Sequence, residues 1–415
     1  MSIVKKGKIL AILDGGAGSS GKAKIGSYIF KNHEFDFACS NGSSNASHTV
    51  VIGGTTTVLK HLSSAIVIPN SVSKVYAGHG SAIDLQALKE EISIAEKNGI
   101  DVGIDYLAPI IQDIDIGYEK GTHDFEGNLL NNELQHNGTI KTGSTCSGSG
   151  SARARKIMRK SNLLLARDVD WLKPYLCNVG HDIICRLNQG ESGVMEIPQG
   201  FQLSYGISDF YPNTTSRNST IAGGFDDMMV PPSYLGDVII NFRTYPIRIC
   251  SKKYIDKVTG NHLTWDQVQS NEYEYEVIDS DSGGGYQDQE EITWDQISSN
   301  VGRPVMETTT LTKLPRRVFN FSFDNMHSAI AHNMTNHTIH ISINFMNYVN
   351  GEDEGVTDYL ELSNKSKEWL NEIMRDINPY DNVILSYVGT GADTDDMVLL
   401  NNKTFLDENS RVTQF

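Results

Sequence analysis

The chain has 415 residues, with 51 acidic and 35 basic side chains and a net charge of −16 at neutral pH. Its 39% hydrophobic and 21% charged residues are typical of a globular protein, and no run approaches the ~18 apolar residues of a membrane span. The acidic balance excludes a protein that coats nucleic acid, because such a protein needs clustered Lys and Arg, but it does not exclude a local pocket for a small anion.

The first predicted element is a buried strand over Lys8–Asp14, an apolar run that ends at a glycine-rich turn. A helix is expected to open over Lys24–Lys31, directly behind this turn. Farther along, Leu85–Asn98 carries its apolar residues on one helical face. Asp84 is its expected N-cap, and Asn98-Gly99 supplies the stop.

Near the C-terminus the sequence predicts a helix over Ser363–Ile377, closed by Asn378-Pro379. A strand over Val383–Val388 and a glycine-rich loop, Gly389–Asp393, follow it. Strands, glycine-rich turns and helices in succession indicate an α/β fold with a largely parallel sheet.

The segment Ser251–Asn300 is more polar and aromatic than its surroundings and contains an imperfect repeat. Leu263–Asn271 and Ile292–Asn300 share the pattern Thr-Trp-Asp-Gln. Two copies are too few for a solenoid. We therefore expect a surface insertion or a subdomain, and the simplest explanation of the repeat is a duplicated start of a capped helix.

A glycine-rich loop, Gly15–Lys24, follows the first strand and is the strongest candidate for a binding site. Glycines let successive backbone N–H groups face one anion, and a helix N-terminus adds its positive end. The spacing Gly16-x-x-x-x-Gly21-Lys22 fits the phosphate-loop pattern, although Ala23 stands where a Ser or Thr would hold Mg²⁺. We predict phosphate binding with Lys22 reaching the terminal phosphates; the alternative is a flexible turn.

Three further segments are weaker candidates when taken singly. Asn45–Thr49 places His48 in a loop of small polar residues, but a lone histidine is more often structural than catalytic. Gly143–Ala152 is a Gly/Ser-rich turn before five cations, either a second anion site or a linker to a basic helix. Thr308–Arg317 joins hydroxyls to three cations, a composition suited to clamping a carboxylate or phosphate, or else to a solvated loop.

Taken in order, these segments resemble the adenylosuccinate synthetase family over most of the chain. The family's Gly-Asp-Glu-Gly-Lys-Gly-Lys loop is matched by Gly18–Lys24, and its Asn-Ala-Gly-His-Thr by Asn45–Thr49. Its Gly-Thr-Thr-Gly-Arg-Gly loop resembles Gly143–Gly148, its Gly-Ala-Gln-Gly resembles Ile197–Gly200, and its Thr-Ser-Ser-Asn-Thr-Thr-Ala-Gly-Gly resembles Thr215–Gly224. Each match is weak alone, but their order and spacing together are specific.

The resemblance implies an adenylosuccinate-synthetase-like α/β fold with a central, mostly parallel sheet, a P-loop-type phosphate loop and helical or loop subdomains, in a single elaborated domain of residues 1–415. It implies three catalytic residues: Ser19, Lys22 and His48. The residues implied for ATP and its phosphates are Gly18, Ser20, Gly21, Lys22, Ala23, Lys24, Gly389 and Gly391. Those implied for the purine monophosphate are Ser19, Asn45, Ser144, Thr145, Arg159, Gln199 and Thr215. Those implied for aspartate are Thr308, Thr309, Thr310, Lys313, Arg316 and Arg317, and those for Mg²⁺ are Ser19 and Ser47.

Departures from the family pattern resemble its bacteriophage branch, which makes 2-amino-2′-deoxyadenylosuccinate from dGMP. Ser19 replaces the family's loop aspartate, the general base and a Mg²⁺ ligand, and a smaller uncharged side chain leaves room for a purine 2-amino group. The guanine-reading Thr-Lys-x-Asp is absent from the corresponding stretch, Ile341–Tyr348, which favours ATP over GTP. Arg243–Arg248 and Tyr286–Trp294 also follow the pattern of the phage branch.

We therefore expect a Mg²⁺-dependent ligase that joins L-aspartate to dGMP, with ATP as phosphate donor and a 6-phosphoryl-purine intermediate, in the synthesis of diaminopurine DNA precursors. Ser19 either orients the proton-accepting group or leaves the proton to another group, such as Asp14 or a Mg²⁺-bound oxygen. Two alternatives remain open: an ordinary adenylosuccinate synthetase acting on IMP and GTP, and a nucleotide-binding homologue without activity, suggested by Ser19, Ser47 and Ala23.

The resemblance also implies a homodimer in which Arg159 enters the partner's site. The sequence shows no signal-peptide pattern at its N-terminus, and its five cysteines lack metal-binding spacing. We therefore predict a cytoplasmic protein, in the host cytoplasm for a phage-encoded chain, with small-molecule substrates and neither a nucleic acid polymer nor a membrane as partner.

Overall fold

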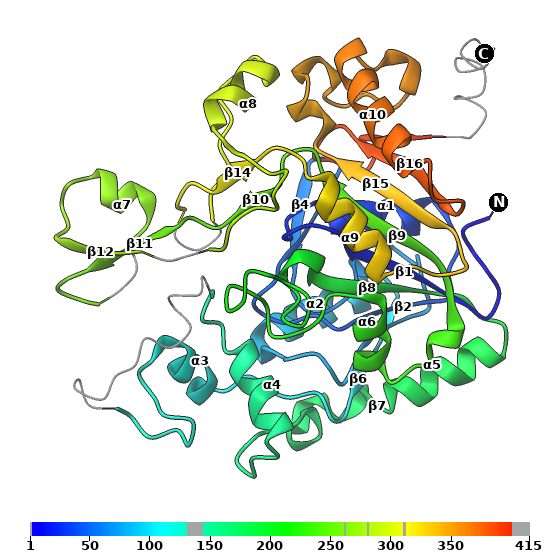
Figure 1. The fold of residues 1–415 in the computed structure, drawn as a ribbon. Coiled ribbons are helices and arrows are strands. Elements are labelled where there is room, and N and C mark those ends of the chain that lie inside the picture. The colour runs from blue at the N-terminus through cyan, green and yellow to red at the C-terminus, as the bar shows by residue number, and fades with distance from the viewer. Residues whose placement is uncertain (1, 131–143, 261–262, 280–281, 310–312, 401–415) are drawn as a thin grey trace.

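A ten-stranded sheet runs through the centre of the computed structural model (Figure 1), which describes residues 2–130, 144–260, 263–279, 282–309 and 313–400. All neighbouring strands in this sheet pair in parallel except β16 with β17. The predicted, mostly parallel sheet is thus confirmed. In spatial order its strands are β17 (Met397–Leu399), β16 (Val383–Gly389), β15 (Ile339–Asn344), β9 (Leu235–Arg243), β1 (Ile9–Asp14), β8 (Gly193–Gly200), β2 (Phe37–Ser40), β5 (Lys74–Ala77), β6 (Asp101–Asp105) and β7 (Leu176–Cys177).

The described residues form helices on both faces of this sheet and also outside it. They are α1 (Lys22–Asn32), α2 (Leu85–Lys97), α3 (Asp113–Lys120), α4 (Ser149–Ile157), α5 (Val179–Asn188), α6 (Ile221–Met228), α7 (Trp265–Gln269), α8 (Trp294–Val301), α9 (Phe323–His332) and α10 (Asn364–Ile377).

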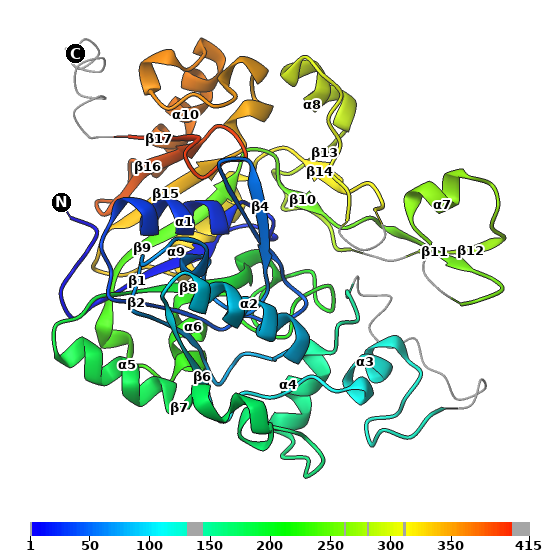
Figure 2. The same ribbon diagram turned by 180° about the vertical axis from the view of Figure 1, so that it is seen from behind.

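Alternate side chains of the central strand β1 enter two hydrophobic clusters. Ile9, Ala11 and Leu13 pack in one cluster with side chains of α5, α6, α9 and α10. Leu10 and Ile12 pack in the other with side chains of α1 and α2, which lie in front of the sheet in Figure 2. Because strand side chains alternate in direction, a fully apolar β1 can serve two cores at once.

The predicted helices form where local capping rules place them. Asp84 accepts hydrogen bonds from the backbone of Gln86 and Ala87 at the start of α2, and Ser363 caps α10. The helix α1 starts two residues earlier than expected, because Gly21 adopts a left-handed conformation (φ 82°) that lets the loop turn directly into the helix.

The segment of residues 251–300 contributes no described strand to the ten-stranded sheet. Its strands β11 (Lys252–Asp256) and β12 (Tyr275–Asp279) pair with each other and, together with α7, project to the left in Figure 1. Thr264 and Thr293 each begin a capping box, at the starts of α7 and α8, so the repeat is a duplicated capped helix start, as predicted. That the segment is an insertion within a single domain of residues 1–415 stays a prediction.

Two smaller sheets complete the chain. β10 (Ile247–Arg248), β14 (Arg317–Phe319) and β13 (Glu291–Ile292) form one, and the hairpin of β3 (His48–Ile52) and β4 (Thr55–Leu59) forms the other. Among the described helices, none is both long and apolar enough to cross a lipid bilayer.

Candidate functional site

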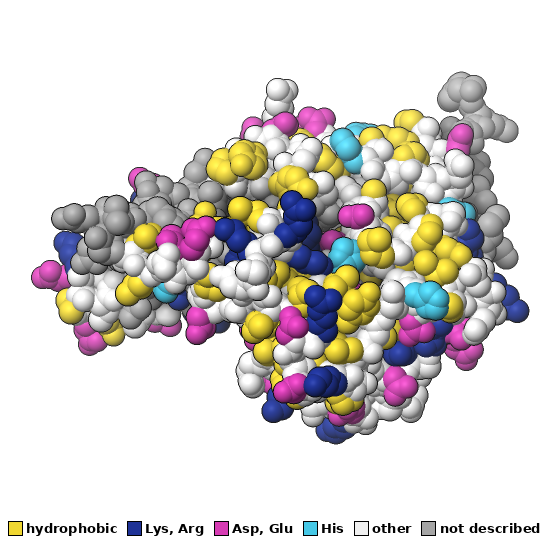
Figure 3. Space-filling model, turned by 90° about the horizontal axis from the view of Figure 1, so that it is seen from below, with side chains coloured by type: hydrophobic (Ala, Val, Ile, Leu, Met, Phe, Trp, Pro, Cys, Tyr) yellow, Lys and Arg dark blue, Asp and Glu magenta, His cyan; other side chains and the backbone are white. Residues whose placement is uncertain are grey.

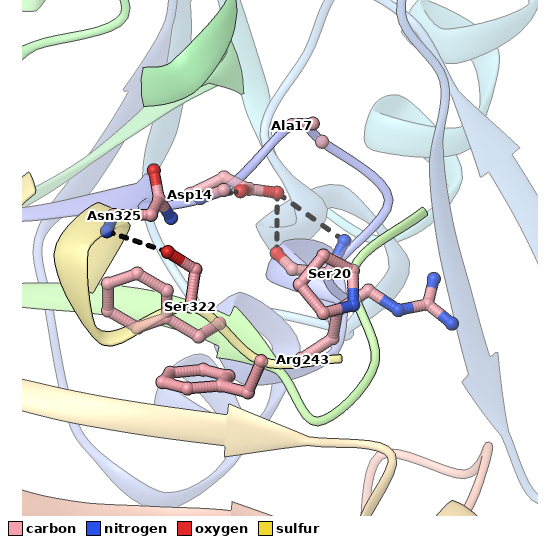
Figure 4. A pocket seen from close by; sticks show the side chains of 11 residues that line it. Asp14, Ala17, Ser20, Arg243, Ser322 and Asn325 are labelled. Carbon is pink, nitrogen blue, oxygen red and sulfur yellow. Dashed lines mark hydrogen bonds between the residues drawn. The ribbon is translucent and has the colours of Figure 1, made fainter. Parts of the chain in front are cut away.

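The loop between β1 and α1 is held in place by side chains from three neighbouring strands. The Asp14 carboxylate accepts hydrogen bonds from the backbone N–H of Gly16 at 2.7 Å and from the Ser20 hydroxyl at 2.5 Å (Figure 4). The Ser20 carbonyl in turn accepts hydrogen bonds from the side-chain amides of Asn241 and Asn344, each at 2.9 Å. The predicted phosphate loop therefore has a fixed shape rather than being a flexible turn.

A small pocket lies against this loop. Figure 4 shows Asp14, Ala17 and Ser20 on one side of it and Ser322 and Asn325 on another. The loop also presses against β8, because a Cβ atom at Gly200 would clash with the backbone of Gly16 and Gly18. Only glycine lets the two backbones approach so closely.

Lys22 points from the start of α1 toward β8. Its buried ammonium group donates hydrogen bonds to the carbonyls of Ile197 and Gln199, the latter at 3.1 Å. Burial lowers the pKa of Lys22 to about 8, although the nearby Asp14 and Glu196 carboxylates oppose this shift. Lys22 is thus mostly charged at neutral pH and lies where the predicted phosphate loop meets β8.

Lys24 has a different environment from the one the sequence suggested. Its ammonium group donates to the carbonyls of Gly391 and Asp396, both at 2.7 Å, and burial lowers its pKa to about 8. Gly389 packs so closely against the Asn344 side chain that a Cβ atom there would clash. The structure therefore brings the predicted phosphate residues Lys24, Gly389 and Gly391 together, but with the Lys24 side chain bound to the loop that follows β16.

His48 opens β3 and is buried. Burial, together with the neighbouring Lys22 ammonium and the His61 ring, lowers the pKa of His48 to about 3. The ring is therefore neutral at physiological pH, so it can offer a hydrogen bond but not the charge of an imidazolium ion. On the preceding loop, Asn45 is half-buried and Ser47 is exposed.

A buried arginine that the sequence analysis did not single out supports the loop before His48. The Arg217 guanidinium donates to the Ser43 hydroxyl at 2.6 Å and to the Asn41 carbonyl, and it forms an ion pair with Asp227 at 3.3 Å. Arg153 pairs with the same carboxylate at 3.3 Å. Burial opposes ionisation of Asp227, but the two arginines outweigh it and hold its pKa below the usual range. The sequence does show an Arg at position 217 where the family has a Ser. It does not show that this side chain would be buried.

Gln199 and Thr215, both predicted to bind the purine monophosphate, carry buried polar atoms that lack hydrogen-bond partners among the described residues. These atoms are the Gln199 Nε2 and the Thr215 Oγ1. Gln199 also has a left-handed backbone conformation, with φ 67°. Because buried polar groups are nearly always paired, and backbone strain gathers at functional sites, both residues have the features of ligand-binding groups.

The turn before α4 corrects one expectation from the sequence. The backbone N–H groups of Gly148, Gly150 and Ser151, which were a candidate anion site, already bind the Glu119 carboxylate at 2.9, 2.9 and 3.1 Å. A carboxylate at a helix N-terminus accepts hydrogen bonds from the free N–H groups there and interacts favourably with the helix dipole. Glu119 lies too far away in the sequence for local rules to identify it as the cap.

Ser144 and Thr145 lie just before this helix start. The Ser144 hydroxyl accepts a hydrogen bond from the Cys146 N–H at 3.0 Å, and Thr145 is exposed. The Lys253 ammonium of β11 donates to the Ser144 carbonyl at 3.4 Å, and burial lowers the pKa of Lys253. The segment of residues 251–300 thereby places a cation beside the predicted monophosphate loop.

Arg159 follows α4 and is exposed, with φ 57°. Two hydrophobic neighbours, Ile157 and Met158, are also exposed, at 79% and 56%. In contrast, Arg155 of the same basic run is buried and pairs with Asp115 at 3.0 Å. The run therefore contains both structural cations and a cation available to a ligand or a second chain.

Within the predicted aspartate-binding segment, Thr308, Thr309, Lys313 and Arg316 come together in one turn. The Arg316 guanidinium donates to the Thr308 carbonyl at 3.2 Å, and the Lys313 N–H donates to the Thr309 carbonyl at 3.1 Å. Thr310 lies outside the described residues. Arg317 forms an ion pair with Glu291 of β13 at 2.7 Å, so it has a structural partner in addition to its predicted role.

Ser19 is exposed at the tip of the first loop and has a left-handed backbone conformation, with φ 54°. The Arg243 guanidinium donates a hydrogen bond to the Ser19 carbonyl at 2.9 Å. Within the described part of the chain, no three His, Cys, Asp or Glu side chains gather to hold a metal ion. The predicted Mg²⁺ residues Ser19 and Ser47 fit Mg²⁺ only in the way usual at phosphate-transfer sites, where substrate phosphates and waters supply most ligands.

Comparisons with known proteins agree with this architecture. A family model described as adenylosuccinate synthetase matches residues 12–166. The N6-succino-2-amino-2′-deoxyadenylate synthase of Vibrio phage phiVC8 is 30% identical over 345 residues, which cover 81% of this chain and 85% of the relative.

Two solved structures are similar over nearly the whole chain. The succinoaminodeoxyadenylate synthetase of cyanophage S-2L, bound to dGMP and to dATP as an energy donor, has a TM-score of 0.72 at 27% identity and covers 97% of both chains. The adenylosuccinate synthetase of Plasmodium falciparum has a TM-score of 0.71 at 15% identity, with 95% of this chain and 100% of that chain covered, and so shares the fold.

The fold and the site define an α/β protein built around a phosphate-loop-type strand, loop and helix, with cations and unpaired polar groups gathered at the carboxyl ends of parallel strands. The chain belongs to the adenylosuccinate synthetase family. The fold and the family resemblance predicted from its motifs, including the likeness to phage members, are confirmed.

Proposed function

We propose that this chain is a ligase that joins L-aspartate to dGMP, uses ATP as phosphate donor and yields 2-amino-2′-deoxyadenylosuccinate, a precursor for diaminopurine DNA. The observation that carries the proposal is Ser19, an exposed and uncharged residue at the tip of the first loop where the resembled family has an aspartate. The phage relative named as a synthase of this product and the cyanophage structure holding dGMP support the same substrate.

In the first step, the purine O6 attacks the γ-phosphate of ATP while the bond from that phosphorus to ADP breaks and the purine N1 gives up its proton. ADP leaves, and a 6-phosphoryl intermediate forms. Phosphoryl transfer depends mainly on positioning and on stabilising charge at the transferred group. Lys22 and the backbone N–H groups of residues 19–23 supply positive charge and hydrogen bonds there. Burial beside β8 fixes the Lys22 ammonium before the substrates arrive, so it need not reorganise during the reaction.

His48 and Ser19 have supporting roles. The neutral His48 ring donates a hydrogen bond to charge that develops on the transferred group. Ser19 orients the group that accepts the purine proton, because its own hydroxyl is far too weak an acid to replace a carboxylate base. Asp14 is a poor candidate for the base, since its carboxylate is buried and already accepts hydrogen bonds from Gly16 and Ser20.

The dGMP phosphate is held by Thr145 and Thr215 of one subunit and by Arg159 of a second, in a homodimer. Asn45, Ser144 and Gln199 contact the same nucleotide. The exposed apolar side chains that flank Arg159 support burial of this region against another chain. Figure 3, the view from below, shows hydrophobic side chains mixed with basic and acidic ones on this face of the molecule.

In the second step, the amino group of L-aspartate displaces phosphate from C6. The turn that contains Thr308, Thr309 and Arg316 binds the aspartate carboxylates, and Lys313 and Arg317 add charge nearby. Ser19 and Ser47, together with the ATP phosphates, would hold Mg²⁺, and the ion would supply positive charge that neutralises the phosphates. The enzyme works in the cytoplasm, where its three small substrates are available.

The proposal is tested by incubating the protein with aspartate, Mg²⁺ and each combination of dGMP or IMP with ATP or GTP, and measuring product by mass and by phosphate release. We expect turnover with dGMP and ATP. Activity confined to IMP with GTP would identify an ordinary adenylosuccinate synthetase. Absence of turnover with every purine monophosphate would identify a nucleotide-binding homologue without activity.

A further inference from the structure

Arg243, the last residue of β9, contacts three segments of the chain: the first loop, the residue before the aspartate-binding turn, and the stretch after β15. Its guanidinium donates to the Ser19 carbonyl of the first loop at 2.9 Å. Although it is itself buried, it forms an ion pair with the partly exposed Glu307, which directly precedes the aspartate-binding turn. Its Cζ atom lies 4.0 Å from the ring centroid of Phe345, in the stretch after β15 where the resembled family reads the nucleotide base.

The Arg243–Glu307 pair is the centre of a charged and aromatic network. Tyr348 donates a hydrogen bond to the Glu307 carboxylate. Burial opposes ionisation of Glu307, but Arg243 and then Arg316 outweigh it and keep the pKa of this carboxyl low. The backbone N–H of Arg316 also donates to the Glu307 carbonyl at 2.9 Å, so a shift of Glu307 moves the aspartate-binding turn with it.

The site therefore depends on a single side chain with a planar, forked arrangement of donors. A lysine ammonium at position 243 carries the same charge but cannot donate to Ser19, pair with two carboxylate oxygens of Glu307 and stack on Phe345 together. The left-handed peptide of Ser19 is a strained conformation that needs such external support.

We propose that Arg243 is a positioning residue that couples the first loop to the aspartate-binding turn, so that both steps of the reaction depend on it. Arg243 acts through Ser19 and Glu307 and need not touch a substrate itself. This inference rests on the proposed function, because it concerns the two steps of that reaction.

Three variants test the coupling: Arg243→Lys, Glu307→Gln and the double variant. The first step is followed alone by positional isotope exchange in β,γ-bridge-labelled ATP with dGMP and without aspartate. The second is followed by kcat/KM for aspartate. Misplacement of reacting groups by about 1 Å costs on the order of 100-fold in rate, so we expect losses of about that size in both measurements for Arg243→Lys. Because the pair acts as a unit, the double variant should be no worse than the worse single variant.

The matched controls are Arg303→Lys and Glu354→Gln, which alter an exposed ion pair of 2.7 Å outside the site and should leave both rates unchanged. Glu307→Gln keeps the side-chain shape and leaves Arg243 in place, so it tests the coupling even if Arg243→Lys does not fold.

Folded variants that keep both rates within about twofold, or a double variant whose loss is the product of the single losses, would overturn the inference. A change in aspartate kinetics with normal isotope exchange would also overturn it, because the two steps would then be independent. Failure of the proposed function appears separately, in the wild type: if that enzyme uses IMP instead of dGMP, the same variants are compared with IMP. A wild type inactive with every purine would overturn both.

Discussion

The side-chain amides of Asn241 and Asn344 hydrogen-bond to each other at 3.0 Å, and both donate to the carbonyl of Ser20 at 2.9 Å. One amide comes from β9 and the other from the end of β15, so two strands far apart in the sequence fix one peptide of the phosphate loop. Asn344 also donates to the Gly21 carbonyl at 3.2 Å, where α1 begins.

The first prediction concerns the side-chain amide of Asn344. Asn344→Asp replaces a donor by an acceptor that faces the carbonyls of Ser20 and Gly21 and the Oδ1 of Asn241. We expect the KM for ATP to rise by an amount equivalent to about 1–3 kcal/mol, the usual cost of leaving buried polar groups unpaired. Steady-state kinetics measure this change. Asn32→Asp, at an exposed position at the end of α1, is the matched control, and an unchanged KM for ATP in Asn344→Asp would contradict the prediction.

The second prediction concerns Ser19. Ser19→Asp should impair use of dGMP and favour a substrate without the 2-amino group, such as dIMP, because a carboxylate would crowd the purine C2. Asp tolerates the left-handed backbone conformation at this position, so the variant should fold. Ser19→Asn has a side chain of the same size as Asp but without its charge, so it separates the effect of size from the effect of charge. The measurement is kcat/KM for dGMP and dIMP, and equal or better use of dGMP by Ser19→Asp would disprove the steric argument.

The third prediction concerns the dimer. Arg159→Leu should weaken dGMP binding, and mixing it with an inactive Lys22→Ala variant should restore part of the activity, because mixed dimers contain one intact site. Arg167→Leu, at another exposed position, should keep full activity alone. Activity of the mixture is measured against each variant alone at equal total protein. Lack of rescue would leave Arg159 in the site of its own subunit or make its role structural.

The fourth prediction concerns pH. Burial lowers the pKa of Lys22 to about 8, so the charged form is lost as pH rises through about 8, and kcat/KM for ATP should fall there. His48, with a pKa of about 3, stays neutral and should contribute no transition between pH 5 and 7. Lys22→Arg should move the alkaline limb to higher pH because a guanidinium stays charged. Lys24 also has a pKa of about 8, so Lys24→Arg is the control. If the alkaline limb of the pH profile moves in Lys24→Arg and not in Lys22→Arg, the assignment to Lys22 is wrong.

The fifth prediction concerns the segment of residues 251–300. Lys253 reaches the Ser144 carbonyl at 3.4 Å, so Lys253→Gln removes a cation beside the predicted dGMP phosphate loop. We expect a higher KM for dGMP and an unchanged KM for ATP. Lys252→Gln, at the exposed neighbouring position, is the matched control. Equal effects of the two variants would show that only general surface charge matters.

Local rules in the sequence predict the elements well but not the charged contacts that support the site. The caps at Asp84, Ser363, Thr264 and Thr293 are local, because each cap binds backbone groups within three residues of itself. These helices could therefore be placed from the sequence to within a residue or two of their observed starts.

The long-range pairs could not be predicted in this way. Glu119 and Gly148 are 29 residues apart, and Arg243 and Glu307 are 64 residues apart. In the sequence, a charged side chain that will be buried against a distant partner looks the same as one that will face water. Only the fold brings the two groups together, which is why Arg217, Glu119 and the Arg243–Glu307 pair emerged from the structure alone.

The close contact at Gly200 has an evolutionary consequence. Because no side chain fits between β8 and the backbone of Gly16 and Gly18, residue 200 must stay a glycine as long as the loop keeps this path. Substrate preference in this lineage can therefore diversify through side chains at the loop tip, such as Ser19, while the path of the backbone beneath them stays the same.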